Sequence, residues 1–555
     1  MDKPWLDSYP EGVPHNISES SLKPLSQVME ECYQKYKDKP SFTCMGKSLS
    51  FSEMKSLSNQ LADYFSRSLG LVKGDKVALM MPNTLQYPIC LQAAIRLGLV
   101  VVNVNPLYTP RELEHQLNDS GATTIVILEN FASTLEAVLK KTKVKNIIVT
   151  SLGDMLGTLK GSLVNFVVRY IKKMVPSYSL PGSCSFKKAL ALGKSNFNKF
   201  PLISLNDIAF LQYTGGTTGF SKGAILTHRN ISSNMAQAFV WLKGSIKEGE
   251  EIIITALPLY HIFSLTANCL TYMGVGANNI LITNPRDIPG FIKTLSKYKY
   301  TTITGVNTLF NALLNHEKFA KLDFSSLRIA LGGGMAVQEA VAKKWKEVTG
   351  VPLLEAYGLT ETSPAVCINP LSTKDYNGSI GIPLSSTMVS IRDVKTNAIK
   401  DPGQEGEICI KGPQVMSGYW KNDKETKNVF TEDGYFKSGD IGVMDKNGYF
   451  RIVDRKKDMI LVSGFNVYPN EIEAVVSTHL GVLECAAVGV SCGRSGEKVK
   501  LFVVKKDPDL TVDEIKDHCR KSLTAYKVPK EIEFRDELPK TNVGKILRRA
   551  LREGQ

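Results

Sequence analysis

Leu211-Gln-Tyr-Thr-Gly-Gly-Thr-Thr-Gly-Phe-Ser-Lys-Gly-Ala224 is the stretch that restricts the fold of this 555-residue chain most strongly. It is crowded with glycine, threonine and serine, and Lys222 stands near its end. The apolar run that starts at Ile208 leads into it and reads as a strand. Glycine lets a chain turn back without a Cβ clash, so backbone N–H groups and threonine hydroxyls can approach a polyphosphate. We therefore predict a phosphate-binding loop that follows a strand.

The spacing of this loop differs from the commonest phosphate loop, G-x-x-x-x-G-K-[ST]. Gly223 follows Lys222 here, where that pattern requires serine or threonine. The sequence therefore argues against a GTPase or kinase-type loop. A generic glycine-rich turn is the alternative, and the dense mixture of threonine and glycine disfavours it. The candidate phosphate-binding residues are Thr214, Gly215, Gly216, Thr217, Thr218 and Gly219.

Length and composition describe a globular protein with a sizeable core. Hydrophobic residues make up 43% of the chain and charged residues 22%, which are ordinary values for such a protein. The length predicts about two to four domains. No run of 18 apolar residues occurs, and the start of the chain lacks the apolar core of a signal peptide. The ten cysteines include no C-x-x-C pair, which favours reduced thiols in the cytoplasm and argues against a structural zinc site.

The net charge of +14 indicates anionic partners. Zinc-finger, homeodomain and RNA-binding signatures are missing from the sequence, so we expect no nucleic-acid partner. Nucleotide substrates and an anionic membrane surface need fewer assumptions.

The chain changes character along its length. Residues 21–200 read as mixed α/β, with buried parallel strands predicted at Val77–Met81 and Thr124–Leu128. Thr109 and Pro110 are typical of a helix start. Residues 200–390 repeat the theme of strand, loop and helix.

The last third of the chain predicts two smaller units. Residues 404–454 place regularly spaced glycines between short strands, which indicates a small β-rich region. After Arg455 we predict a compact α+β unit, with strands near 485–490 and 499–505 and a helix near 511–524.

Residues 163–175 form an amphipathic segment. Leu163, Val167, Tyr170, Ile171 and Met174 fall on one helical face, and Asn165, Arg169, Lys172 and Lys173 fall on the other. This pattern fits an ordinary surface helix packed on the core by its apolar face. It also fits an interfacial membrane helix, and both interpretations stay open.

Further segments accompany the loop in a fixed order. They are Leu257-Pro-Leu-Tyr-His-Ile-Phe263, Gly332-Gly-Gly334 with Leu354-Glu-Ala-Tyr-Gly-Leu-Thr-Glu-Thr362, Asp433-Gly-Tyr-Phe-Lys-Ser-Gly-Asp440 running on to Lys457, and Pro539-Lys-Thr-Asn-Val-Gly-Lys-Ile-Leu-Arg548. With these segments the chain resembles the adenylate-forming superfamily of acyl-CoA synthetases, adenylation domains and luciferases, from about residue 20 to residue 550. Together with Leu107–Arg111 and Thr283–Asp287, the stretch 433–457 is similar to that of bacterial long-chain fatty acid–CoA ligases.

The resemblance implies an α/β fold with a large N-terminal adenylate-forming domain. That domain would consist of stacked α/β subdomains and a small distorted β-barrel, over residues 1–455. A hinge at 456–458 would lead to a small mobile α+β C-terminal domain over 459–555. Relatives in the superfamily are often dimeric, which leaves a homodimer open.

The resemblance also implies roles for single residues. Lys545 would neutralise the substrate carboxylate and the α-phosphate during adenylation, and Lys222 would hold the β- and γ-phosphates. Thr360 would contact the α-phosphate, while Glu361 would hold Mg²⁺. The residues expected around adenine and ribose are Gly333, Tyr357, Gly358, Asp440 and Arg455.

The remaining implied residues belong to the acyl group and to CoA. His261, Gly305 and Asn307 would line the acyl pocket, and Leu265 stands where some fatty acid ligases have a tryptophan gate. Lys457 would be the hinge residue, and Gly464 would leave room for the pantetheine arm of CoA.

We therefore expect an ATP-dependent, Mg²⁺-requiring ligase that joins a long-chain fatty acid to CoA through an acyl-adenylate. It would be cytoplasmic, with peripheral contact to the inner face of the cell membrane through 163–175 as an open option. The alternatives are an acyl-AMP ligase that loads a carrier protein, a luciferase-like oxygenase, and a membrane- or nucleic-acid-binding protein with an inactive ligase fold.

Overall fold

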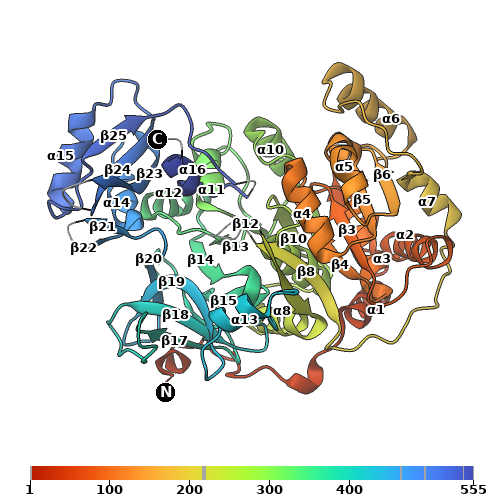
Figure 1. The fold of residues 1–555 in the computed structure, drawn as a ribbon, viewed down its shortest axis with the longest axis horizontal. Coiled ribbons are helices and arrows are strands. Elements are labelled where there is room, and N and C mark those ends of the chain that lie inside the picture. Colours follow the sequence, from red (N-terminus) through yellow and green to blue (C-terminus); the bar gives the residue numbers. More distant parts are fainter. Residues whose placement is uncertain (1–2, 215–220, 463–464, 493–495, 542, 554–555) are drawn as a thin grey trace.

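A computed structural model describes residues 3–214, 221–462, 465–492, 496–541 and 543–553. A large N-terminal domain carries two stacked α/β sheets and a smaller β-sheet, and a small C-terminal domain lies at one end of the long axis (Figure 1). The predicted fold class is confirmed in this arrangement.

The first α/β sheet has seven strands in the order β7-β6-β5-β3-β4-β8-β9. Its pairs are parallel except β8 with β9. The strands are β3 (Lys76–Met80), β4 (Val100–Asn103), β5 (Thr124–Leu128), β6 (Asn146–Thr150), β7 (Cys184–Ser185), β8 (Ile208–Thr214) and β9 (Lys222–Thr227). The helices of this part are α1 (Leu25–Lys35), α2 (Phe51–Asp63), α3 (Gln86–Arg96), α4 (Pro110–Ser120), α5 (Ala132–Val138), α7 (Phe186–Leu192) and α8 (His228–Leu242).

The strands and the helix start that the sequence predicted between residues 77 and 128 are present in the structure. Strands β3 and β5 pair in parallel and are almost wholly buried, as short continuous apolar runs require. Thr109 caps α4 through a reciprocal capping box with Glu112, and Pro110 fills the first helical position.

The second sheet has nine strands in the order β16-β15-β14-β13-β12-β10-β11-β1-β2. They are β1 (Pro40–Cys44), β2 (Lys47–Ser50), β10 (Ile252–Thr255), β11 (Asn278–Leu281), β12 (Thr302–Gly305), β13 (Ile329–Gly333), β14 (Leu353–Gly358), β15 (Ala365–Ile368) and β16 (Ile382–Pro383). The helices of this part are η7 (Ser264–Thr271, a π-helix), α9 (Tyr272–Gly274), α10 (Ile288–Leu295), α11 (Asn307–Leu314) and α12 (Glu339–Thr349).

The predicted phosphate loop joins two antiparallel strands. Thr214 at the end of β8 pairs with Lys222 at the start of β9. The chain therefore runs strand, loop, strand, and only then enters α8. In P-loop enzymes a helix directly follows the phosphate loop. The strand at this position therefore agrees with the difference between this sequence and the P-loop pattern.

The β-rich region forms a four-stranded antiparallel sheet in the order β17-β18-β19-β20. These strands are β17 (Met388–Arg392), β18 (Gly406–Lys411), β19 (Phe436–Met444) and β20 (Phe450–Arg455), with α13 (Asp423–Val429) inserted between β18 and β19. An isolated bridge from Gly381 to Phe450 ties this sheet to the segment after β15.

Residues 456–458 form a turn between β20 and the C-terminal domain. This domain has its own apolar core, which includes Val467, Ile472, Leu501 and Ile515. Its strands are β21 (Ile460–Val462), β22 (Phe465–Val467), β23 (Val482–Cys492), β24 (Gly496–Lys505) and β25 (Glu531–Phe534), and its helices are α14 (Pro469–Val476), α15 (Val512–Ser522) and α16 (Arg548–Glu553).

The amphipathic segment differs from the prediction of one regular helix. It consists of α6 (Thr158–Phe166) and a π-helical continuation, η6 (Val167–Ile171). The interpretation that the apolar face packs on the core is wrong, because Leu163, Tyr170 and Ile171 are exposed. In the described part of the chain, no helix is long and apolar enough to cross a membrane.

Candidate active site

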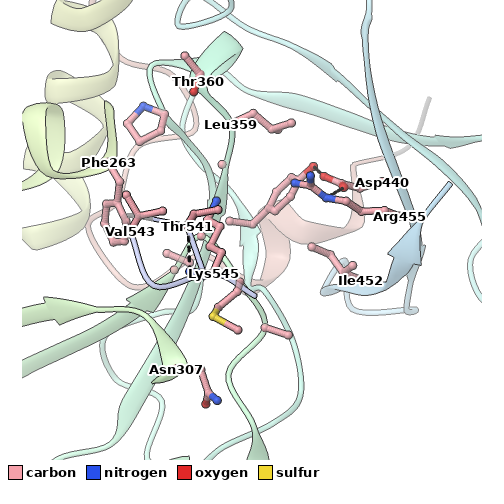
Figure 2. A pocket seen from close by; sticks show the side chains of 18 of the residues that line it. Phe263, Asn307, Leu359, Thr360, Asp440, Ile452, Arg455, Thr541, Val543 and Lys545 are labelled. Atoms are coloured by element: carbon pink, nitrogen blue, oxygen red, sulfur yellow. Dashed lines mark hydrogen bonds and ion pairs between the residues drawn. The ribbon is translucent and has the colours of Figure 1, made fainter. Parts of the chain in front are cut away.

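One cavity of about 2460 Å³ runs between the N-terminal sheets and the C-terminal domain. Segments far apart in the sequence meet there, from β8 and β9 to the turn before α16. Figure 2 shows Thr360, Asp440 and Lys545 around the same space. The described candidate residues that line the cavity are Thr214, Lys222, His261, Asn307, Gly333, Tyr357, Gly358, Thr360, Glu361, Asp440, Arg455, Lys457 and Lys545.

Asp440 is held by two partners. The Tyr357 hydroxyl donates to its Oδ2 at 2.7 Å, and the Arg455 Nε lies 3.2 Å from its Oδ1 (Figure 2). Burial raises the pKa of Tyr357 well above its usual range, and the Asp440 carboxylate adds to this effect. Tyr357 is therefore a neutral donor, and it presents an aromatic ring to the cavity beside a buried carboxylate.

Glu361 is a carboxylate in the wall of the cavity. It belongs to a short 3-10 helix, η8 (Thr360–Thr362), and the Tyr419 hydroxyl donates to its Oε1 at 2.8 Å. Its backbone oxygen accepts from the Met416 N–H at 2.7 Å, which ties this turn to the β-rich region. Burial raises the pKa of the Glu361 carboxyl. A cation bound beside it would reverse that effect.

Lys222 forms an ion pair with Glu425 of α13. Its ammonium also lies 5.4 Å from the centre of the Tyr419 ring. The Lys222 ammonium, which was expected to hold phosphates, is therefore paired with an acidic side chain. The neighbouring candidates Gly215, Gly216, Thr217, Thr218 and Gly219 lie outside the described residues.

Lys545 reaches the cavity from the C-terminal domain. Thr541 accepts from its backbone N–H at 3.0 Å, and Thr308 of α11 donates to the Gly544 oxygen at 2.9 Å. Gly334 has a φ of +79° and passes so close that a Cβ there would lie 3.1 Å from the Lys545 Cε. Burial lowers the pKa of Lys545 to about 8, and the Arg455 guanidinium adds to the effect.

His261 faces Lys545 in the wall of the cavity. Burial lowers the pKa of its imidazole to about 3, and the charge of Lys545 contributes. The ring is therefore neutral at physiological pH. Its Nδ1 accepts from the Phe263 N–H at 3.3 Å, so the proton sits on Nε2. A neutral N–H donor suits an anionic substrate group and does not require a general base.

The two other acyl-pocket candidates are less directly placed. Gly305 ends β12 against Phe310, and it does not line the cavity in the described structure. Asn307 lines the cavity, but its amide group exchanges hydrogen bonds with Gln338 at 2.9 and 3.1 Å, and Figure 2 places it away from Thr360. Leu265 is fully buried in η7.

An apolar arm of the cavity extends between α8, η7 and the nine-stranded sheet. Its apolar side chains come from all three elements, namely Ala238, Trp241, Ala267, Ile329, Leu331 and Ile368, and the same elements also contribute Asn234, Thr266, Thr271, Thr302 and Thr304 to the lining. Such walls favour a hydrocarbon chain over a polar substrate.

A charged cluster flanks the turn at 456–458. Arg548 of α16 pairs with Glu473 at 2.7 Å and lies 3.7 Å from Asp454 and 3.6 Å from Asp458. Burial raises the pKa of Asp454 to about 6. Lys457 is exposed within the turn. Gly464, expected on the CoA path, lies outside the described residues.

The arrangement can hold a nucleotide and neutralise phosphate charge. Among the described residues no group of three histidine, cysteine, aspartate or glutamate side chains that could hold a metal ion occurs. Mg²⁺ commonly uses one or two carboxylates together with phosphate oxygens and water, and Glu361 as a single carboxylate fits that habit.

Sequence reasoning missed four residues of the site. Tyr419 and Glu425 contact Glu361 and Lys222 from a region that carried no motif signal. Arg548 is the last residue of the motif that starts at Pro539, and the sequence assigned it no role. Glu355 lies within a quoted motif, two residues before Tyr357, and burial raises its pKa to about 8. Only the burial of its carboxyl group distinguishes Glu355, and burial cannot be read from one sequence.

Comparisons with known proteins agree with this geometry. The model of the AMP-binding enzyme family matches residues 29–420, and that of the AMP-binding enzyme C-terminal domain matches 471–545. Among solved structures, ATP-bound MatB from Rhodopseudomonas palustris has a TM-score of 0.83 and 26% identity, with 95% of this chain and 98% of that chain covered.

Curated relatives cover the whole chain. The long-chain-fatty-acid–CoA ligase of Salmonella typhimurium is 56% identical over 553 residues, which are 100% of this chain and 98% of that protein. The enzyme of the same name from Haemophilus influenzae is 52% identical, and that from Bacillus subtilis is 38% identical, each over 98% of its length and at least 99% of this chain. Family model, relatives and fold agree, and the chain belongs to the AMP-binding enzyme family.

Proposed function

We propose that this protein is an ATP-dependent, AMP-forming ligase that joins long-chain fatty acids to CoA. The fatty acid carboxylate attacks the α-phosphate of ATP and releases pyrophosphate, which leaves an acyl-adenylate. The CoA thiol then attacks the acyl carbonyl, loses its proton, and AMP leaves. The observation that carries the proposal is Lys545 of the C-terminal domain, which lies in one cavity with Thr360, Glu361 and Asp440. The names of the curated relatives supply the substrate class.

The nucleotide would lie across the Tyr357–Asp440 side of the cavity. The Asp440 carboxylate accepts both ribose hydroxyls, and the Tyr357 ring stacks on adenine next to Gly333 and Gly358. Arg455, already paired with Asp440, contacts ribose or phosphate. A nucleotide bound at the Tyr357–Asp440 side would have its triphosphate directed toward Thr360.

The phosphates require positive charge and hydrogen-bond donors. Lys222 leaves Glu425 and binds the β- and γ-phosphates, while Thr214 and the loop 215–219 supply further donors. Glu361 would hold Mg²⁺, which would offset the charge of the phosphates. Thr360 donates its hydroxyl to the α-phosphate.

The attack joins two anions, so repulsion between them must be offset. Lys545 lies within the charge field of Arg455, Asp440 and Glu361, and its ammonium neutralises the carboxylate and the α-phosphate together. The His261 Nε2–H orients the carboxylate. The hydrocarbon chain extends into the apolar arm between α8 and η7.

The thioester step needs the C-terminal domain in a second orientation. Thr308–Gly544 and Asn311–Leu483 contacts hold the present orientation, in which Lys545 serves adenylation. We propose that the domain turns about Lys457, withdraws Lys545, and brings the loop around Gly464 to the cavity as the path of CoA.

Three other functions would behave differently from a CoA ligase. A carrier-protein ligase shares the first step and differs only in the thiol, and full-length similarity to enzymes named CoA ligases favours CoA. A luciferase-like oxygenase would consume oxygen. An inactive binding protein has no need for Lys545, Thr360, Glu361 and Asp440 in one cavity.

One assay separates these functions. Pyrophosphate release from ATP is measured with acetate, octanoate or oleate, each with and without CoA. We expect sustained release with oleate and CoA, and oleoyl-CoA as product. Adenylate without thioester would indicate a carrier protein, oxygen uptake an oxygenase, and no release with any acid a binding protein.

We also propose a cytoplasmic enzyme with peripheral contact to the inner face of the membrane. All ten cysteines lie in the described part of the chain and none is in a disulfide, which suits a reducing compartment. A homodimer remains a hypothesis, which sedimentation velocity of the purified chain tests.

A further inference from the structure

An unusual apolar surface stands at the edge of the N-terminal domain. It belongs to α6 and η6, the gold helix at the upper right of Figure 1. Of the 17 large hydrophobic side chains exposed in the described chain, six lie between residues 159 and 174, so they form a patch and not a scatter. They are Leu159 (88% exposed), Leu163 (63%), Phe166 (52%), Tyr170 (61%), Ile171 (64%) and Met174 (55%).

These side chains are spaced to share one helical face. Steps of three or four residues lead from Leu159 through Leu163, Phe166 and Tyr170 to Met174. The rings of Phe166 and Tyr170 contact each other, with centroids 5.3 Å apart. We call this surface the apolar face of α6–η6.

The opposite side of the same helix attaches it to the protein, where Val168 is buried and Val164 packs against the core beside polar contacts. Asn165 Oδ1 accepts from the Gly153 N–H at 2.6 Å, and Arg169 pairs with Glu129, which is buried. At Gly161 the backbones touch, because a Cβ there would lie 2.3 Å from the Gly153 oxygen. A water-facing helix normally buries its apolar stripe and exposes its polar one. Here Val164 and Val168 pack on the domain, and a second, larger set of apolar side chains is presented outward.

The sequence around this face is basic, although Arg169 is paired with Glu129 and Lys187 with Asp154. Residues 155–206 contain eight basic residues and not one aspartate or glutamate. They therefore contribute +8 to a chain whose net charge is +14. Lys172 and Lys173, both exposed, directly follow η6 at the rim of the apolar face.

We propose that the apolar face of α6–η6 is a docking site for a bilayer surface with anionic headgroups. The apolar side chains would enter the boundary of the acyl chains, and Lys172 and Lys173 would meet the headgroups. A second copy of this chain fits worse, because it would place two segments of +8 against each other. The contacts of Asn165 and Arg169 with the domain already hold the apolar face outward, so docking needs no rearrangement of the helix.

The position of the face suits the proposed function, on which this inference rests. Long-chain fatty acids partition into bilayers, so a docked ligase meets its substrate there. The C-terminal domain lies at the opposite end of the long axis from α6 (Figure 1). A protein docked by α6–η6 therefore leaves the domain that carries Lys545 free to turn.

Sedimentation with vesicles tests the inference. The probes are vesicles of equal parts phosphatidylglycerol and phosphatidylcholine, and vesicles of phosphatidylcholine alone. The test variant is Leu163→Glu/Phe166→Glu/Ile171→Glu, and Lys172→Glu/Lys173→Glu is a second variant that leaves the helix face intact. The matched control is Val394→Glu/Ile399→Glu/Leu480→Glu, which changes three exposed apolar side chains elsewhere.

We expect wild type and control to bind the anionic vesicles, and to bind them less in high salt or without phosphatidylglycerol. The triple variant of the face should bind at least about tenfold more weakly, because three apolar side chains no longer enter the bilayer. The lysine variant should lose the preference for anionic lipid.

Three results would overturn the inference: no binding by wild type, equal binding by both triple variants, or a dimer that only the face variant disrupts. Turnover of albumin-bound oleate is measured in parallel and should be the same in all variants. Failure of wild type in that assay would remove the ligase proposal and leave the vesicle result standing.

Discussion

At the scale of the residue, Lys545 is the side chain on which the proposed chemistry depends. Lys545→Ala should slow adenylation by about 10²–10³, since one preorganised contact to developing charge is worth about 3–4 kcal/mol. Thioester formation from supplied acyl-adenylate should stay largely intact, because Lys545 is withdrawn for that step. Each half-reaction is measured separately, with Lys521→Ala, an exposed lysine of α15, as the control. Equal loss of both steps would refute the role.

The lowered pKa of Lys545 makes a second prediction at this scale. With a pKa of about 8, the ammonium is present at pH 7 and is lost as the pH rises through 8. kcat/KM for ATP in pyrophosphate exchange should therefore fall above about pH 8, because this parameter reports the free enzyme. Lys545→Arg, whose charge persists to about pH 12, should be slower and should lack this alkaline decline. The same decline in both proteins would assign it to another group.

At the scale of the element, the turn at 456–458 decides whether the C-terminal domain can move. Lys457→Pro fixes one backbone dihedral in that turn. We expect it to slow thioester formation much more than adenylation, since only the second step requires rotation. Lys457→Ala keeps the backbone free and should retain both steps. Loss of adenylation alone in the proline variant would place the hinge elsewhere.

At the scale of the whole molecule, the proposed mechanism assigns the two half-reactions to two arrangements of the same domains. Asn311 of α11 donates to the Leu483 oxygen at 3.1 Å across the interface. Cysteines placed at 311 and 483 and joined by a short bismaleimide should hold the present arrangement. CoA is itself a thiol and cannot reverse this cross-link.

Pyrophosphate exchange should survive the cross-link, and acyl-CoA formation should be lost. Cys184 and Cys492, the two native cysteines that are not buried, are replaced by serine in this background. The Asn311→Cys protein treated with the same reagent is the control and should complete both steps. Full acyl-CoA formation after cross-linking would show that no rotation is needed.

The sequence by itself determined the elements and the family. Apolar runs and caps such as that at Thr109 act within a few residues of their own position, so β3, β5 and α4 could be predicted closely. Motif order identified the superfamily and most residues that now line one cavity, including Lys222, Asp440 and Lys545. Each of these signals is local or depends on order along the chain.

Only the tertiary structure decided which side chains meet and which faces are covered. Glu425 pairs with Lys222, and Tyr419 with Glu361, across long sequence separations. The direction of α6 could not be predicted either, since amphipathic spacing defines two faces and does not say which one packs. The contacts of Asn165 and Arg169 with partners on the domain settle that choice, and such partners are brought together only when the whole chain has folded.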